Sequence, residues 1–174
     1  MLRRFSRDRR GIAAVEFAIC APVMILLYYG VAELTLGMMA ERRASHAASV
    51  VADLVAQTSS TSSAEVTDMF NVGAAILAPF PSAPLKLRVS AVTADANGVA
   101  QVVWSRGYGQ GGLGTGPVAS FPAGLLAANE SIIMTEMKYT YDSPLHEALP
   151  NALNFAETFY LKPRKSSSVA CSNC

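Results

Sequence analysis

Glu16 is the residue most suited to a chemical role, because it is an ionisable group inside an otherwise apolar stretch. Residues 12–32 contain no other charged side chain, and residues 17–32 are sixteen consecutive uncharged positions. A carboxylate within a bilayer costs about 2.5–3.5 kcal/mol on insertion scales, so it is retained for a partner or a task. We therefore expect Glu16 either to pair with a positive charge or to reach toward the nearby membrane interface.

A second candidate is the cysteine pair at the end of the chain. Cys171 and Cys174 have C-x-x-C spacing but follow a Ser-rich, basic tail, whereas redox catalysis uses a helix N-terminus to lower the thiol pKa. In an oxidising compartment a small disulfide is the simplest expectation, with intermolecular bonding and metal capture as the alternatives. We expect Cys20 to act as a small apolar residue facing lipid or another helix.

Other reactive groups do not form a recognisable constellation. The glycine-rich segment 109–116 lacks the Gly-Lys-Ser/Thr sequence that holds phosphates. His46 and His146 each lack a second ligand at metal-binding spacing. We therefore predict no catalytic residue, no metal site and no cofactor, and a protein that is not an enzyme.

Charge is distributed very unevenly along the 174 residues, of which only 16% are charged. Residues 1–11 carry five arginines and one acid, a net charge of +4, ahead of the apolar stretch. A short basic leader before about 20 apolar residues is typical of one membrane span with a cytoplasmic N-terminus, and it excludes a nucleic-acid-binding face. A cleaved secretory signal is disfavoured, because the apolar region is longer than the usual 7–15 residues.

These elements together resemble the TadE-like pseudopilins (TadE/TadG family) of tight-adherence, or Flp, pilus systems. The resemblance is carried by four features in order along the chain: Arg9-Arg10-Gly11, Ala14-Val15-Glu16-Phe17-Ala18, Pro22 and Glu33. It implies that a prepilin peptidase cuts between Gly11 and Ile12, which makes Glu16 the fifth residue of the mature chain.

The resemblance also implies roles for individual residues. Glu16, followed by Phe17, would set assembly and axial register, with the carboxylate pairing with the new amine of Ile12 in a neighbouring subunit. A carboxylate in low dielectric gains much from a nearby ammonium. Proline inside a helix removes one backbone donor and usually bends the helix, so we expect a bend at Pro22.

The periodicity predicts one long helix from about Ile12 to Gln57, roughly 69 Å at 1.5 Å per residue. After the apolar half, small residues such as Ala44, Ala47 and Ala48 recur at helical spacing. Ser62 and Glu65 form the sequence signature of a capping box, which predicts a second helix over about 63–78. The prolines that follow end this helix.

Strand signals dominate the rest of the chain. Residues 85–91 alternate cleanly, and a turn at Asn97-Gly98 leads to a return strand over 99–106. We expect a loop rather than a core element over 107–117, a short helix within 121–129, and strands over 131–141 and 155–162 joined by a loop around 143–154.

The sequence therefore predicts an α+β, pilin-like fold, with a long N-terminal helix packed on an antiparallel sheet of about four strands. Its expected divisions are a basic cytoplasmic leader (1–11), a transmembrane helix (12–33), a periplasmic helix extension (34–57), a periplasmic α+β domain (58–165) and a C-terminal tail (166–174). Residues 41–174 hold 19 charges in 134 positions, about 14%, which suggests a surface that meets other subunits.

The predicted function is that of a non-enzymatic minor pilin or pseudopilin in Flp-type pilus biogenesis and adhesion, in the bacterial inner membrane. The partners implied are a prepilin peptidase, the major Flp-type pilin and other minor pilins, and the inner-membrane pilus platform; nucleic acid is not among them. One alternative is a pseudopilin-like subunit of another secretion or competence pilus. Another, of a different class, is a membrane-anchored envelope sensor or enzyme.

Overall fold

The structure is a computed structural model that describes residues 11–118, 121–122, 124–144 and 151–174. The chain divides into two units, one formed by residues 1–38 with 142–152 and one by residues 39–141 with 153–174. The first unit contains the N-terminal part of helix α2 (Ile12–Ala56). The second unit contains the remainder of α2, a second helix and all the strands.

Helix α2 is continuous over 45 residues and includes Pro22. It ends at Ala56, where the chain enters a polar run of Thr and Ser. The Thr58 hydroxyl donates to the carbonyl of Val55 at 2.8 Å. Such local side-chain bonds compete with the helical ladder, so the polar run explains why the helix stops here, close to the predicted end at Gln57.

Helix α3 (Ser63–Ile76) begins at the predicted capping box. The backbone N–H of Glu65 donates to Ser62 Oγ at 3.3 Å, and Glu65 Oε2 accepts from the backbone N–H of Ser62 at 2.8 Å. Two donors that would otherwise lack intrahelical partners are thus satisfied reciprocally. The side chain of Arg43 on α2 donates to the carbonyls of Ile76 and Ala78 at the other end of α3.

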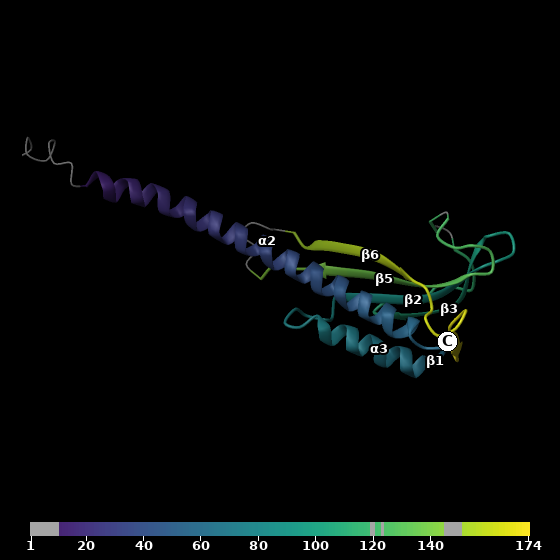
Figure 1. The fold of residues 1–174 in the computed structure, drawn as a ribbon. Helices are drawn as coiled ribbons and strands as arrows, with labels where there is room; N and C mark the ends of the chain where they lie inside the picture. Colours follow the sequence, from purple (N-terminus) through teal and green to yellow (C-terminus); the bar gives the residue numbers. More distant parts are fainter. Residues whose placement is uncertain (1–10, 119–120, 123, 145–150) are drawn as a thin grey trace, which may run out of the picture. The chain divides into compact units, whose positions relative to one another are not determined.

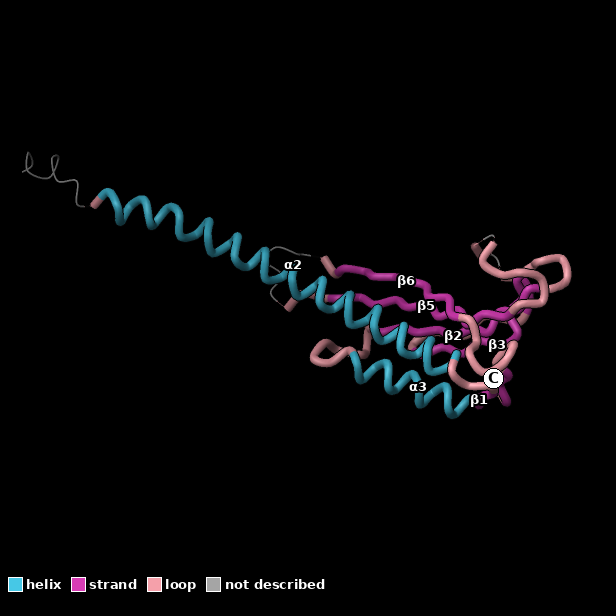
Figure 2. Tube along the Cα trace, in the orientation of Figure 1, coloured by secondary structure: helices cyan, strands magenta, loops and turns pink. Residues whose placement is uncertain are grey.

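The main sheet has five antiparallel strands in the order β4-β3-β2-β5-β6 (Figure 1). Their bounds are β2 (Leu85–Ala94), β3 (Ala100–Tyr108), β4 (Gly116–Pro117), β5 (Ser131–Tyr141) and β6 (Leu153–Leu161). A register shift between Ala91 and Val92 marks an irregularity in the β2–β3 pairing. In Figure 2 the second half of α2 lies beside α3 along this sheet, and the Ser45 hydroxyl donates to Glu157 on β6.

One face of the sheet packs against the helices. Leu87 is fully buried and lies near the α2–α3 contact, since its Cδ1 is 3.3 Å from the position that a Cβ on Gly73 would occupy. Because side chains alternate along a strand, Leu85, Val89 and Ala91 share this face. The matching stripe on α2 is made of small, fully buried residues: Ala40, Ala44, Ala47, Ala48, Val51, Ala52, Val55 and Ala56. Their small size allows close packing of helix and sheet.

The opposite face of the sheet carries a second hydrophobic cluster. Val92, Val102 and Met134 are buried there, together with Ala100 and Ile132. The cluster is covered by partly buried residues of the segment between β3 and β5: Leu113, Val118, Phe121, Leu125 and Leu126. The segment between β3 and β5, which includes Leu113 of the glycine-rich stretch, therefore covers a sheet face.

The structure confirms the α+β class with a long N-terminal helix on an antiparallel sheet, and it corrects four details. The sheet has five strands, not about four, because Gly116–Pro117 adds β4. Strand β3 extends through Gly107 to Tyr108, so part of the expected loop is strand. The described residues of 121–129 form turns and bends rather than a helix.

The fourth correction is a second, two-stranded sheet. Strand β1 (Ser60–Ser62) pairs in parallel with β7 (Ala170–Ser172). Both strands have only three residues and lie in Ser-rich stretches, which give no alternation of apolar and polar residues to read. The expected loop around 143–154 lies partly outside the described residues, at 145–150.

Candidate assembly site on the first helix

The predicted processing site lies at the start of α2. Gly11 immediately precedes the helix, Ile12 is its first residue, and the Gly11 carbonyl accepts from the Val15 N–H at 3.1 Å. Both residues are exposed, and a Cβ added at Gly11 would meet nothing within 4 Å. The peptide bond between them is therefore open to another molecule, as cleavage would require.

Glu16 and Phe17 are both exposed on α2, and Phe17 retains 73% of its accessible surface. Residues four apart on a helix lie on the same side, so Glu16 stands one turn above Ile12 on one face. The carboxylate of Glu16 and the ring of Phe17 are thus both exposed within the same turn of α2. The assembly role given to them remains a prediction.

Most of the large apolar side chains in the first half of α2 are exposed as well. They include Val15, Ile19, Val23, Met24, Ile25, Leu26, Leu27, Tyr28, Val31 and Leu34. Among the described residues, α2 is the one helix long and apolar enough to cross a membrane. Exposed apolar patches on a soluble monomer rarely exceed a few hundred Å², so this surface fits a membrane anchor.

Pro22 lies within α2, and the helix continues through it. Because proline has no N–H, the carbonyl of Ala18 loses its usual donor four residues later. Neighbouring helices or side chains can satisfy such a carbonyl within a membrane. The predicted bend at Pro22 remains a prediction.

Glu33, which the resemblance places near the end of the span, is in a different environment from Glu16. Its side chain is fully buried, whereas Glu16 is exposed. Sequence reasoning treated both as acids of one apolar segment and did not separate them. Of the two carboxylates, that of Glu16 is therefore the one accessible from outside the chain.

A polar group that sequence reasoning missed lies on the sheet face opposite the helices. Arg88 binds Glu136 through two contacts, Nε to Oε2 at 2.6 Å and Nη2 to Oε1 at 2.7 Å. Their side chains are 19% and 23% exposed. The signal was available in part, because the alternation over 85–91 puts Arg88 on the opposite face from Leu87.

Arg88 and Glu136 line a cavity of about 670 Å³ together with Tyr160 and Phe121. The two rings meet edge to face with centroids 5.6 Å apart. Burial raises the pKa of the Tyr160 hydroxyl above its ordinary value, and the Glu136 carboxylate raises that pKa further. The contact between Phe121 and Tyr160 thus joins the covering segment to β6 beside the ion pair.

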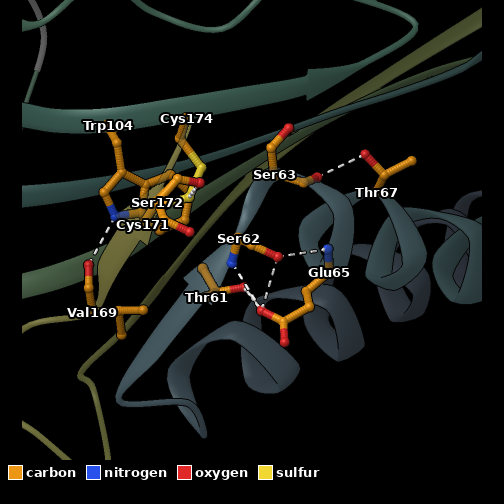
Figure 3. Close-up of a disulfide and its surroundings, with 10 residues drawn as sticks. All are labelled: Thr61, Ser62, Ser63, Glu65, Thr67, Trp104, Val169, Cys171, Ser172 and Cys174. Carbon is orange, nitrogen blue, oxygen red and sulfur yellow. Dashed lines mark hydrogen bonds between the residues drawn. A yellow bond between two sulfur atoms is a disulfide. The ribbon is translucent and has the colours of Figure 1, made fainter.

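At the end of the chain, the structure joins Cys171 and Cys174 in a disulfide (Figure 3). Cys20 is a free cysteine, exposed on α2. His46 is exposed, and His146 lies outside the described residues. No group of three or more metal-binding side chains occurs in the part of the chain that the structure describes.

Comparison with known protein families gives a match that covers most of α2. Residues 11–53 match the family model described as TadE-like protein, so this segment, from the predicted processing site almost to the end of α2, is similar to that family. No curated protein and no solved structure matches the chain.

Proposed function

We propose that this TadE-like chain is a non-enzymatic minor pilin or pseudopilin of a Tad, or Flp-type, pilus system. A prepilin peptidase cuts it after Gly11, and its apolar helix holds it in the bacterial inner membrane before assembly. The N-terminus is cytoplasmic, and the domain that follows α2 is periplasmic. The mature subunit takes part in pilus biogenesis and, through the pilus, in adhesion.

One observation carries the proposal: Gly11, Ile12 and Glu16 are exposed at the start of an apolar helix, within the TadE-like match. Cleavage creates an amine at Ile12 and leaves Glu16 one turn away. A helix carrying a carboxylate in the bilayer is stabilised when a positive charge from a neighbouring subunit reaches it. Pairing of this amine with Glu16 of another subunit would therefore fix the axial register between helices.

The folded domain supports a structural role. Its two hydrophobic clusters are built around the sheet, and its conspicuous ion pair, Arg88 with Glu136, is satisfied internally. Residues 41–174 are also poor in charge, with 19 charged residues in 134 positions. A surface with few charges loses little hydration when it is covered by another subunit.

The partners follow from the proposal. They are the prepilin peptidase at Gly11, the major Flp-type pilin and other minor pilins along α2, and the inner-membrane platform that assembles them. Helix contacts within the membrane would involve the exposed apolar residues of α2, because close van der Waals packing of side chains stabilises helix pairs there.

The test is genetic complementation in cells that carry a complete Tad system. Deleting the chain should abolish or strongly reduce surface pili and adhesion, and the full-length chain should restore both. A chain lacking residues 58–174 provides a comparison that retains the predicted processing site and anchor. Normal piliation of the deletion strain would contradict the proposal.

A further inference from the structure

The docked tail, defined as residues 164–174 and so two residues longer than the predicted C-terminal tail, is held at its start by the end of α2. The backbone N–H of Arg164 donates to the carbonyl of Ala56 at 2.8 Å, which satisfies one of the last carbonyls of the helix. Arg164 Nη2 also lies 2.7 Å from Asp53 Oδ1. The tail therefore begins at a fixed point beside α2.

The middle of the tail is held by Trp104 on β3, which is the only tryptophan in the chain. The indole N–H of Trp104 donates to the carbonyl of Val169 at 2.8 Å. Val169 is 2% exposed and Trp104 is 5% exposed. The contact between Trp104 and Val169 (Figure 3) thus combines a buried apolar side chain with a buried hydrogen bond. Loss of this contact would expose the indole to water.

The end of the tail pairs with β1, where Cys171 is opposite Thr61 and Ser172 is opposite Ser62. Cys171 is bonded to Cys174, with the two Cα atoms 5.7 Å apart. Cys174 is exposed and Cys171 is partly exposed. The disulfide ring therefore contains residues of the strand itself and offers a sulfur to solvent.

We infer that Cys171 and Cys174 form a thiol–disulfide exchange site, whose reactant is a dithiol, and that its oxidation state controls docking of the tail. The closed ring restricts the backbone of Cys171 and Ser172 before they pair with β1. The oxidised tail thus loses less conformational entropy on docking than the reduced tail does. Reduction releases the tail from β1 and Trp104 and leaves the main sheet intact.

The exchange begins when a thiolate of the dithiol attacks the sulfur of Cys174. The S–S bond breaks, and the Cys171 sulfur leaves as a thiolate and takes up a proton. The second thiol of the reactant then attacks the mixed disulfide and releases Cys174, which is protonated in turn. The chain gains two electrons and two protons, and the reactant becomes a disulfide.

Docking and reduction are linked in both directions. If oxidation favours docking, docking disfavours reduction by the same factor. A change that undocks the tail without touching either cysteine should therefore make the disulfide easier to reduce. A disulfide that is not coupled to docking would be reduced to the same extent in the docked and the undocked chain.

The first experiment uses the full chain carrying Cys20→Ser, purified in detergent, before and after treatment with excess dithiothreitol. Alkylation followed by mass spectrometry should count two new thiols. Trp104 emission should shift to longer wavelength, and quenching by acrylamide should rise about twofold as the indole is exposed. The far-ultraviolet circular dichroism should stay the same. Oxidation should restore the starting spectra.

Three results would overturn the inference: two new thiols with unchanged Trp104 emission, failure of dithiothreitol to reduce the bond, or loss of the domain's secondary structure on reduction. A variant with both Cys171→Ser and Cys174→Ser provides an independent reading. It should show the emission of the reduced chain without any reductant, and emission like that of the oxidised chain would also overturn the inference.

The second experiment compares Val169→Asp with Ser168→Asp, which adds the same charge one residue earlier at an exposed position. Val169→Asp should undock the tail and shift the equilibrium with dithiothreitol toward the reduced form by about tenfold, measured by alkylation after equilibration at fixed ratios of reduced to oxidised dithiothreitol. Ser168→Asp should leave this equilibrium near that of the parent chain. Equal reduction equilibria in the two variants would contradict the coupling between docking and reduction.

Discussion

Gly73 on α3 and Val51 on α2 lie so close that a Cβ on Gly73 would be 2.7 Å from Val51 Cγ2. The same Cβ would be 3.3 Å from Leu87 Cδ1 on the sheet. Because Val51 and Leu87 are fully buried, neither can move aside into solvent. The two helices and the sheet thus meet at a point that accepts no side chain.

Gly73→Ala should destabilise the domain by about 1 kcal/mol, since overpacking costs about 1–3 kcal/mol and exceeds the helix-propensity gain of about 1 kcal/mol. The free energy of unfolding, measured by denaturant titration with Trp104 fluorescence, tests this. Gly111→Ala is the control, because a Cβ there meets nothing within 4 Å. A more stable Gly73→Ala variant would contradict the packing described.

Ser62→Ala should lower the free energy of unfolding by about 1 kcal/mol, the usual cost of removing an N-cap oxygen. The Ser62 side chain accepts from the N–H of Glu65, and alanine leaves that donor without its cap. Ser63→Ala is a matched control, since the recorded bond from the Thr67 hydroxyl goes to the backbone carbonyl of Ser63. Equal losses in the two variants would argue against the capping box as the source of stability.

Tyr160 should ionise later than ordinary tyrosines, because burial first, and the Glu136 carboxylate second, raise its pKa above 10.0. Above pH 10 the unfolded chain loses this proton before the folded chain does, so stability should fall as pH rises from 10 toward the folded pKa. The tyrosinate absorbance of the parent and of Tyr160→Phe measures the titration directly.

In Glu136→Gln the pKa of Tyr160 should fall only part of the way toward 10.0, because burial is the larger cause. Tyr139, whose pKa burial also raises, should titrate late in both chains and serves as an internal reference. A complete return of Tyr160 to ordinary titration in Glu136→Gln would show that charge, rather than burial, dominates its environment.

Glu16→Ala should leave membrane insertion intact and abolish crosslinking to pilins, because removing a carboxylate from the apolar stretch makes insertion easier and deletes the proposed assembly contact. Membrane fractionation and crosslinking in cells with a complete Tad system measure the two effects. Glu41→Ala is the matched control, an acid on the same helix beyond the apolar stretch. Normal incorporation of Glu16→Ala would exclude the pairing.

The sequence predicts the elements with strong periodicity well. The ends of α2 and α3 lie within two residues of prediction, because Ser62 with Glu65 marks one start and the polar run after Ala56 marks one end. Strand β5 was predicted at its observed bounds. In each case the local sequence pattern changes at the residue where the element begins or ends.

What the sequence does not predict depends on contacts between distant residues. Strand β7 forms because Val169 docks on Trp104, 65 positions away, and strand β4 forms because Gly116–Pro117 meets Gln101 and Val102. Neither segment has the alternation that marks a strand. The pairing of Arg88 with Glu136 likewise follows from the β2–β5 register, which cannot be read from either strand alone.

The most direct test of the account is the intact mass and N-terminal sequence of the chain extracted from membranes of cells that contain the prepilin peptidase. We expect removal of 11 of the 174 residues, which leaves a chain of 163 that begins at Ile12. Gly11→Val should remain uncut, and because a Cβ at Gly11 meets nothing within 4 Å, misfolding would not explain that result. A mature chain that still begins at Met1 would contradict the account.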